Sequence, residues 1–307
     1  MTRCLTILFL GWITLGALET KASMAIGSQR FNLRWNGVNR GLPLPFAGRS
    51  NPLIPVRPWV PTPSITFTTN RVMLPDTLNV LFLGNNLVKA NNMASVLTSM
   101  SQLGKLKIRA KTYAPGGYSL FNHSVDIHSV TNISTSFPDF RNFKNRIPQH
   151  VIVLQEHTRA PVYTPAVTLA SAQRLNVRGQ AARSQIAFLL PHAMGDRFYS
   201  TAEMYRQAER SIYGVAAQLN APVVPAGLAW QLVEARHPDI RLRDRTGFLP
   251  SQHGTYLNAC MMYCALTWQS PLGLSNGGLF QVREREAKIL QRTAWEVFVA
   301  RRGAIPF

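Results

Sequence analysis

From residue 77 onward, short apolar runs alternate with amphipathic segments, and this alternation restricts the chain to few folds. Runs typical of strands lie at 79–84, 106–113, 150–155, 185–190 and 222–225. Segments with helical spacing of apolar residues lie at 93–103, 165–183, 202–219, 228–236, 255–268 and 283–301. Strands that alternate with helices build a mostly parallel sheet that helices cover on both faces. We therefore predict a three-layer α/β/α sandwich over residues 77–307.

The chain before this domain divides into two segments. Residues 1–23 place Arg3 ahead of a short apolar run and end in small residues, which is the pattern of a cleaved secretory signal peptide. An uncleaved anchor is the alternative, but the run is shorter than the roughly 20 residues that span a bilayer. Residues 24–76 are rich in proline and predict an extended arm. The protein is thus expected to be secreted or periplasmic, with no transmembrane segment in its mature part.

Charge and cysteine content limit the partners. The chain has 33 Lys and Arg against 14 Asp and Glu, a formal net charge of +19. In an exported protein, this excess favours a polysaccharide or another anionic partner, although a solvated basic surface without a ligand also fits. No specific nucleic-acid motif is present. Cys4 leaves with the signal, and Cys260 and Cys264 are expected as buried, reduced thiols without a disulfide, metal or cofactor.

Polar and glycine residues follow several of the predicted strands. They comprise Gly84-Asn85-Asn86, Gly116-Gly117, Gln155-Glu156 and Pro191-His192. Ligands of open parallel sheets bind at the carboxyl ends of the strands. These residues therefore mark the candidate functional edge of the sheet.

In these motifs the chain resembles the SGNH, or GDSL-type, hydrolases, which are serine esterases and lipases with a flavodoxin-like fold. The resemblance covers roughly residues 78–274. One branch of that family opens with a strand and Gly-Asn-Ser-Phe, which matches residues 84–87 with Asn86 in the place of the nucleophilic serine. The segments Ala114 to Leu120, Val153 to Glu156 and Leu219 to Val223 are similar to later motifs of that branch.

The closing signature of that branch, Asp-x-x-His-Pro-Ser-x-x-Gly-Thr-Tyr-Leu, aligns with residues 246–257. The Pro-Ser and Gly-Thr-Tyr-Leu parts are present. Thr246 stands where the resemblance places the catalytic aspartate, and Leu249 stands where it places the histidine.

These substitutions remove the family's chemistry. The amide of Asn86 is no nucleophile, and Leu249 carries no titratable group. The resemblance implies that Gly117 and Gln155 keep the oxyanion side of the site. We therefore expect a pseudoenzyme that binds a glycan, an acylated ligand or a protein partner through Asn85, Asn86, Gly117 and Gln155.

Two alternatives remain. Catalysis could have moved to a set that uses His253, His192 or Asp244 with a nearby serine, or the chain could be a basic envelope protein that binds polyanions. Structural interpretations favour the pseudoenzyme: an exposed helix-start residue for His253, a structural imidazole for His192 and a helix cap for Ser251. His123, Asp126 and His128 are interpreted as part of a polar loop rather than a metal site.

Overall fold

The computed structural model describes residues 77–134 and 149–302, together with two short strand pairs. The pairs join β1 (Gln29–Arg30) to β2 (Thr68–Thr69) and β5 (Phe137–Pro138) to β6 (Arg146–Ile147), both antiparallel. The expected signal peptide and nearly all of the proline-rich arm lie outside the described residues.

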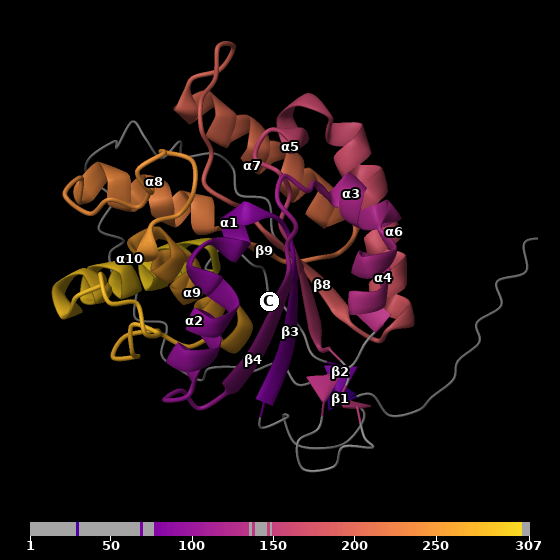
Figure 1. Cartoon of the computed structure of the whole chain (residues 1–307), viewed down its shortest axis with the longest axis horizontal. Coiled ribbons are helices and arrows are strands. Elements are labelled where there is room, and N and C mark those ends of the chain that lie inside the picture. Colours follow the sequence, from indigo (N-terminus) through magenta and orange to yellow (C-terminus); the bar gives the residue numbers. More distant parts are fainter. Residues whose placement is uncertain are drawn as a thin grey trace, which may run out of the picture.

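A five-stranded parallel sheet forms the centre of the molecule (Figure 1). Its strands are β3 (Thr77–Leu83), β4 (Lys107–Tyr113), β7 (Val151–Leu154), β8 (Gln185–Leu189) and β9 (Val223–Val224). They lie in the order β4-β3-β7-β8-β9, and every pair is parallel. This order is that of flavodoxin-like sheets. The predicted mostly parallel sheet is confirmed.

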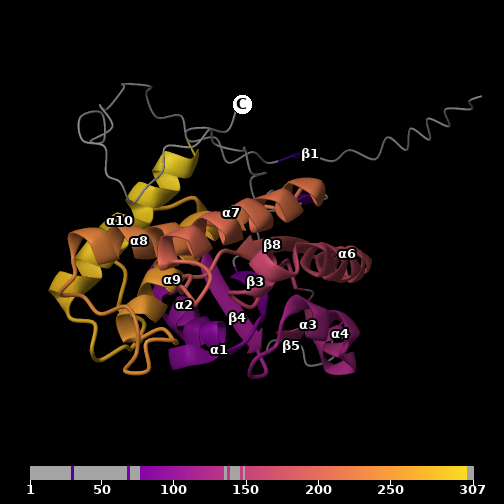
Figure 2. The ribbon, with the colours of Figure 1, turned by 90° about the horizontal axis from the view of Figure 1, so that it is seen from above.

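Helices cover both faces of the sheet, which Figures 1 and 2 show as two layers. On one face lie α2 (Met93–Ser101), α8 (Ala226–Arg236), α9 (Gln252–Thr267) and α10 (Glu284–Arg302). On the other lie α3 (Leu120–Val125), α4 (Ile127–Ser134), α6 (Pro165–Ala181) and α7 (Thr201–Gln218). Three short helices, α1 (Asn86–Lys89), η1 (Ala90–Asn92) and α5 (Ala160–Tyr163), follow strand ends.

Alternate residues of each strand supply the two cores. In β3, for example, Val80 and Phe82 belong to one buried cluster, whereas Leu81 and Leu83 belong to the other. This follows from the two-residue period of strand side chains. Cys260 and Cys264 are buried and free in α9, as predicted.

One segment differs from its prediction. The stretch expected as a polar loop around His123, Asp126 and His128 forms the end of α3 and the start of α4. A capping box at Ser119 and Asn122 begins α3, and Asp126 accepts hydrogen bonds from the first turn of α4. These local caps stabilise two short helices, of which α4 is also amphipathic.

Strand order also locates the edge at which a ligand is expected. The chain moves from β3 outward to β4 and then crosses back to β7 on the other side of β3. The switch point therefore lies between the carboxyl ends of β3 and β7, where doubly wound sheets bind ligands. Gly84 follows the first of these strands and Gln155 the second.

Candidate functional site

Asn85 holds the turn after β3 together. Its Oδ1 accepts the backbone N–H of Leu87 (3.1 Å) and thereby caps α1, while its Nδ2 donates to the carbonyl of Tyr118 (2.8 Å). Its own backbone N–H donates to Oε1 of Gln155 at 3.0 Å. Asn85 is only 3% exposed. Asn85 thus joins three strand ends, since its side chain bonds within the turn after β3 and to Tyr118 after β4, and its backbone N–H bonds to Gln155 after β7.

Asn86 is the first residue of α1, and it is exposed. Its side-chain amide lies beside Gly116, since a Cβ on that glycine would lie 3.4 Å from Oδ1 of Asn86. The N–H of a first helical residue has no partner in its own helix. Gly117 has a φ of +72°, and a Cβ there would meet nothing within 4 Å. This edge of the sheet therefore presents the side-chain amide of Asn86 and the exposed backbone of the turns that follow β3 and β4.

Gln155 is buried beneath this turn. Its Oε1 accepts from the N–H of Asn85, and its Nε2 donates to the carbonyl of Glu156. A Cβ at Gly84 would lie 2.6 Å from the same Oε1, so the glycine permits the close approach. Gln155 orients the backbone of the turn through hydrogen bonds at both ends of its amide.

Glu156 carries a buried carboxylate with several donors. Oε1 accepts the N–H groups of Leu120 (2.9 Å) and His157 (2.7 Å), and Oε2 accepts the hydroxyl of Thr168 (3.2 Å). Burial raises the pKa of Glu156, against the opposite effect of these hydrogen bonds. The residue ties the start of α3 to the end of β7, which is a structural role.

His123 is hydrogen-bonded to the backbone of the turn after β3. One ring nitrogen, Nε2, lies 2.7 Å from the carbonyl oxygen of Gly84 and must donate to it, while Nδ1 lies 2.7 Å from Oγ of Ser129. The ring is fully buried, and burial lowers the pKa of His123. This contact joins residues 39 positions apart, so no motif of the sequence predicts it.

The loop that contains Thr246 and Leu249 lies at the same edge. Asp244 closes the loop: its Oδ1 accepts the hydroxyl of Thr246 (2.6 Å) and the N–H of Leu249 (3.3 Å). The hydrogen bond from Thr246 contributes most to holding the pKa of Asp244 below its usual value. Pro250 accepts a bond from Nδ2 of Asn91 at 3.0 Å, which brings the loop next to the α1 and η1 segment.

His192 is buried under that loop. Its ring stacks on Trp230, with 3.9 Å between centroids and 12° between planes, and its Nε2–H donates to the carbonyl of Phe248 at 3.1 Å. Burial, followed by the charge of Arg243, lowers the pKa of His192 to about 3. A neutral, buried ring that supports a loop agrees with the structural interpretation of His192.

The remaining candidates lie in other contacts. His253 is partly buried in the first turn of α9, where its neighbours include the backbone of Gln281 and Glu286; the expectation of an exposed residue is wrong. Ser251 caps α9 by accepting from the N–H of Gly254, as predicted. Over the described residues, no group of three or more His, Cys, Asp or Glu lies close enough to hold a metal ion.

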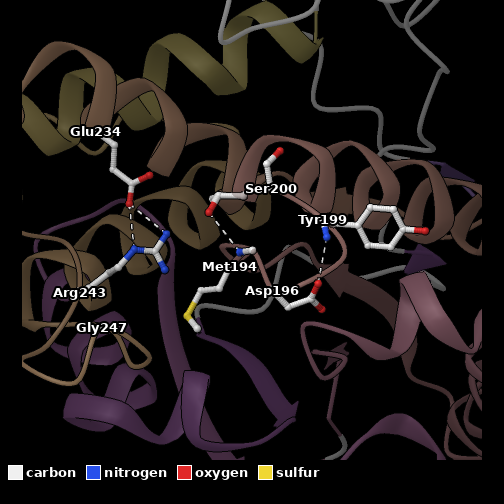
Figure 3. Close-up of a pocket in the computed structure, with 9 residues that line it drawn as sticks. Met194, Asp196, Tyr199, Ser200, Glu234, Arg243 and Gly247 are labelled. Carbon is white, nitrogen blue, oxygen red and sulfur yellow. Dashed lines mark hydrogen bonds and ion pairs between the residues drawn. The ribbon is translucent and has the colours of Figure 1, made fainter.

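An open pocket of about 600 Å³, which no sequence motif predicts, lies beside the loop of Asp244 (Figure 3). It lies between an ion pair, Arg243 with Glu234, and the turn at Asp196 and Tyr199 that precedes α7. Met194, Gly195, Ser200, Thr201 and Gly247 complete its lining. No signal in the sequence connects Glu234 or Asp196 to Arg243, because each lies on a different segment.

Comparisons with known proteins agree with this fold. A protein from Slackia heliotrinireducens, described as a proposed SGNH hydrolase, matches with a TM-score of 0.50 and 22% identity, over 62% of this chain and 99% of that one. A DUF4886 family protein from Bacteroides uniformis ATCC 8492 matches with a TM-score of 0.58 and 15% identity, over 73% and 95%. No family model and no curated protein sequence matches the chain. Likeness at these identities shows the SGNH-type fold.

Proposed function

We propose that this chain, which has an SGNH-type hydrolase fold, is an exported binding protein that no longer hydrolyses esters. One observation carries the proposal. Buried hydrogen bonds with Gln155 and His123 hold the turn after β3, yet Asn86 occupies the position that resembles the family's serine. Leu249 and Thr246 stand at the matching positions of the loop beside it. The scaffold of the site is maintained while the reactive groups are absent.

The same edge has groups suited to a carbonyl-containing ligand. The exposed amide of Asn86 lies against Gly116, and the N–H at the start of α1 has no helical partner. Gly117 leaves the neighbouring turn open to an approaching molecule. Backbone N–H groups of this kind bind carbonyl oxygens in hydrolases. An acylated glycan or a similar acyl ligand is therefore the proposed occupant, bound without cleavage.

The contacts of His192, Asp244 and His253, the candidates for relocated catalysis, favour a binding function over catalysis. His192 is buried and neutral, and its Nε2–H is used by Phe248. Asp244 is occupied by the N–H groups and hydroxyl of its own turn. A general base must reach the proton that it abstracts and titrate near the working pH. His253 has as neighbours Gln281, which precedes α10, and Glu286 in its first turn, rather than residues of this turn.

Restoring the missing groups tests the proposal. With the wild type, p-nitrophenyl acetate should be hydrolysed only at the background rate. The triple variant Asn86→Ser/Thr246→Asp/Leu249→His should exceed the wild type by about 100-fold or more, because a positioned general base alone contributes roughly 10²–10⁴-fold. Initial rates at pH 7.5 measure both.

A matched control separates a restored triad from a chance gain. The variant Asn86→Ser/Thr246→Asp, which lacks the histidine, should remain at the wild-type rate. Ester hydrolysis by the wild type itself, if lost in His253→Ala or His192→Ala, would refute the proposal in favour of relocated catalysis.

Polyanion binding is a second candidate, and the surface of α10 favours it. Arg285, Lys288 and Arg292 share one exposed face of the helix and line a shallow hollow of about 420 Å³. Glu284 also lines this hollow and pairs with Lys288 at 2.6 Å, and Asp239 lies 3.6 Å from Arg285. Replacing all three basic residues with alanine should lower the salt concentration that elutes the protein from heparin. The control Lys89→Ala/Lys105→Ala/Lys107→Ala removes the same charge elsewhere and should elute later than the α10 variant. Equal elution of the two variants would show that net charge alone governs retention.

Export is proposed from residues 1–23 alone. Among the described helices, none has the length and hydropathy that crossing a membrane requires. Amino-terminal sequencing of the protein produced with its natural leader should find cleavage near residues 22–25.

A further inference from the structure

The pocket between Arg243 and Asp196 has the features of a binding site that lies outside the three substituted catalytic positions. Its volume of about 600 Å³ is within the range of small-ligand sites, which is about 300–1,000 Å³. Figure 3 shows the Arg243 and Glu234 pair on one side and the turn of Asp196 and Tyr199 on the other. What could occupy it follows from the hydrogen-bonding groups, the charge and the aromatic rings around it.

The ion pair has unused hydrogen-bonding capacity. Arg243 pairs with Oε1 of Glu234 through Nε (3.2 Å) and Nη2 (3.1 Å), and Nη2 also donates to the carbonyl of Ala193. The second carboxylate oxygen, Oε2, is therefore available as an acceptor at a partly exposed position. A ligand hydroxyl could donate to this oxygen without breaking the pair.

Buried polar atoms lie behind the pair. Within the described part of the chain, Nη1 of Arg243 and Nδ1 of His192 form no hydrogen bond of good geometry, whereas the hydroxyl of Tyr205 lies near the side chain of Arg243 and the backbone of Ala193. His192 and Tyr205 both lie close enough to Arg243 for its charge to influence their pKa values. Buried polar groups are normally satisfied by protein, water or ligand. Of these residues only Arg243 lines the pocket, so a ligand on this side contacts the pair of Arg243 and Glu234 rather than His192 or Tyr205.

Two aromatic residues that do not line the pocket themselves are hydrogen-bonded to Asp196, which lines its opposite side. Phe198 is 64% exposed and Tyr163 is 43% exposed, and their ring centroids are 6.5 Å apart. Asp196 accepts the hydroxyl of Tyr163 at 2.7 Å and the N–H groups of Phe198 and Tyr199, so it fixes the turn and one ring together. Exposed rings held in place beside a polar pocket are typical of a binding surface.

The charges of the pocket are balanced. Arg243 pairs with Glu234, and Asp196 has Arg159 at 3.8 Å. Hydrogen bonding from Tyr163 contributes most to holding the pKa of Asp196 below its usual value, so the carboxylate is ionised at neutral pH. Because neither sign dominates, the pocket has no preference for a strongly charged ligand, despite the net charge of the chain.

We propose that this pocket binds a neutral sugar unit of an oligosaccharide. Sugar hydroxyls match the mixed donors and acceptors of Glu234 and Arg243. A pyranose ring that extends past Asp196 would pack its C–H face on the ring of Phe198, on the side that the guanidinium of Arg197 does not cover. The inference deepens the proposed function, on which it rests, by naming the ligand class. It assigns recognition of the sugar to the pocket beside the substituted catalytic turn.

Calorimetric titration with cellohexaose, xylohexaose, chitohexaose and maltohexaose tests the proposal. At least one of these uncharged sugars should bind the full-length protein. Glu234→Gln should weaken that binding about tenfold, because a hydrogen bond to a charged acceptor becomes a neutral one. Phe198→Ala should weaken it about fivefold through loss of ring contact.

Two substitutions serve as matched controls. Glu296→Gln changes the carboxylate of another ion pair, Arg236 with Glu296, and Phe280→Ala removes a phenyl ring that is 80% exposed. Both should bind the sugar as the wild type does, and all four variants should retain the wild-type unfolding transition. Unchanged affinity in Glu234→Gln and Phe198→Ala would overturn the proposal. It would also be overturned if the protein bound none of the four sugars, or if it bound only a heparin hexasaccharide.

Failure of this inference is distinguishable from failure of the proposed function. Sugar binding that is insensitive to Glu234 and Phe198 but lost in Asn86→Ala would keep the binding function and move the sugar to the turn after β3. Ester hydrolysis by the wild type would refute the non-hydrolytic function, whatever the titrations of Glu234→Gln and Phe198→Ala show.

Discussion

Gly254→Ala should destabilise the protein by about 3 kcal/mol, because the start of α9 has no space for a side chain. A Cβ at this position would clash with the carbonyl oxygen of Leu242 and lie 2.5 Å from Cζ2 of Trp230. Neither atom moves easily: the first belongs to the backbone, and Trp230 is fully buried with its indole N–H bonded to Asn258 at 2.7 Å. Urea unfolding followed by far-UV circular dichroism measures the change.

Gly214→Ala is the matched control. Gly214 lies inside α7, and a Cβ there would meet nothing within 4 Å. The substitution should stabilise the protein by about 0.5–1 kcal/mol, since alanine is the better helix former. Equal effects of the two substitutions would mean that Leu242 and Trp230 do not limit the space at Gly254.

Local periodicity predicted most of the fold. The predicted helix at 202–219 is observed as Thr201–Gln218, and the predicted strand at 185–190 as Gln185–Leu189. Such segments are predictable because burial of one face imposes a 3.6-residue period on a helix, and burial of both faces gives a strand a continuous apolar run. The helices around His123 were missed because they are only 6 and 8 residues long and contain many polar residues, although both begin with caps and α4 is amphipathic.

The sequence located the candidate site but could not describe its contacts. The positions of Asn86 and Leu249 follow from motifs, and the structure brings their segments together through the bond from Asn91 to Pro250. That Gln155 is used within the protein could not be foreseen, since its partner is the backbone of Asn85, 70 residues away. Contacts between distant segments leave no periodic trace in the sequence.

The pocket was even harder to predict from the sequence than the contacts of the turn after β3. Glu234 lies in α8, Arg243 follows that helix, and Asp196 precedes α7. No spacing rule relates the three residues, and only the packing of α7 and α8 against the sheet brings them to one edge. Site prediction from a family motif therefore favours the catalytic positions and overlooks neighbouring surfaces that the motif does not include.

Acidification should weaken the fold through His192. Burial lowers the pKa of this ring to about 3, whereas an unfolded histidine titrates near 6.5. Between these values the unfolded chain binds a proton that the folded ring does not, so stability is full above about pH 6.5 and is lost as the pH falls toward 3. From pH 7 to pH 5, His192 alone should cost about 2 kcal/mol.

His192→Gln isolates this effect, because the glutamine side chain can donate to Phe248 but does not titrate. The other histidines with lowered pKa values, His123 and His253 among them, remain in both proteins and cancel in the comparison. Urea unfolding at pH 7 and pH 5 should therefore show about 2 kcal/mol less acid destabilisation in the variant than in the wild type. Equal losses would mean that His192 takes up a proton in the folded protein, which would make it available as a base and revive relocated catalysis.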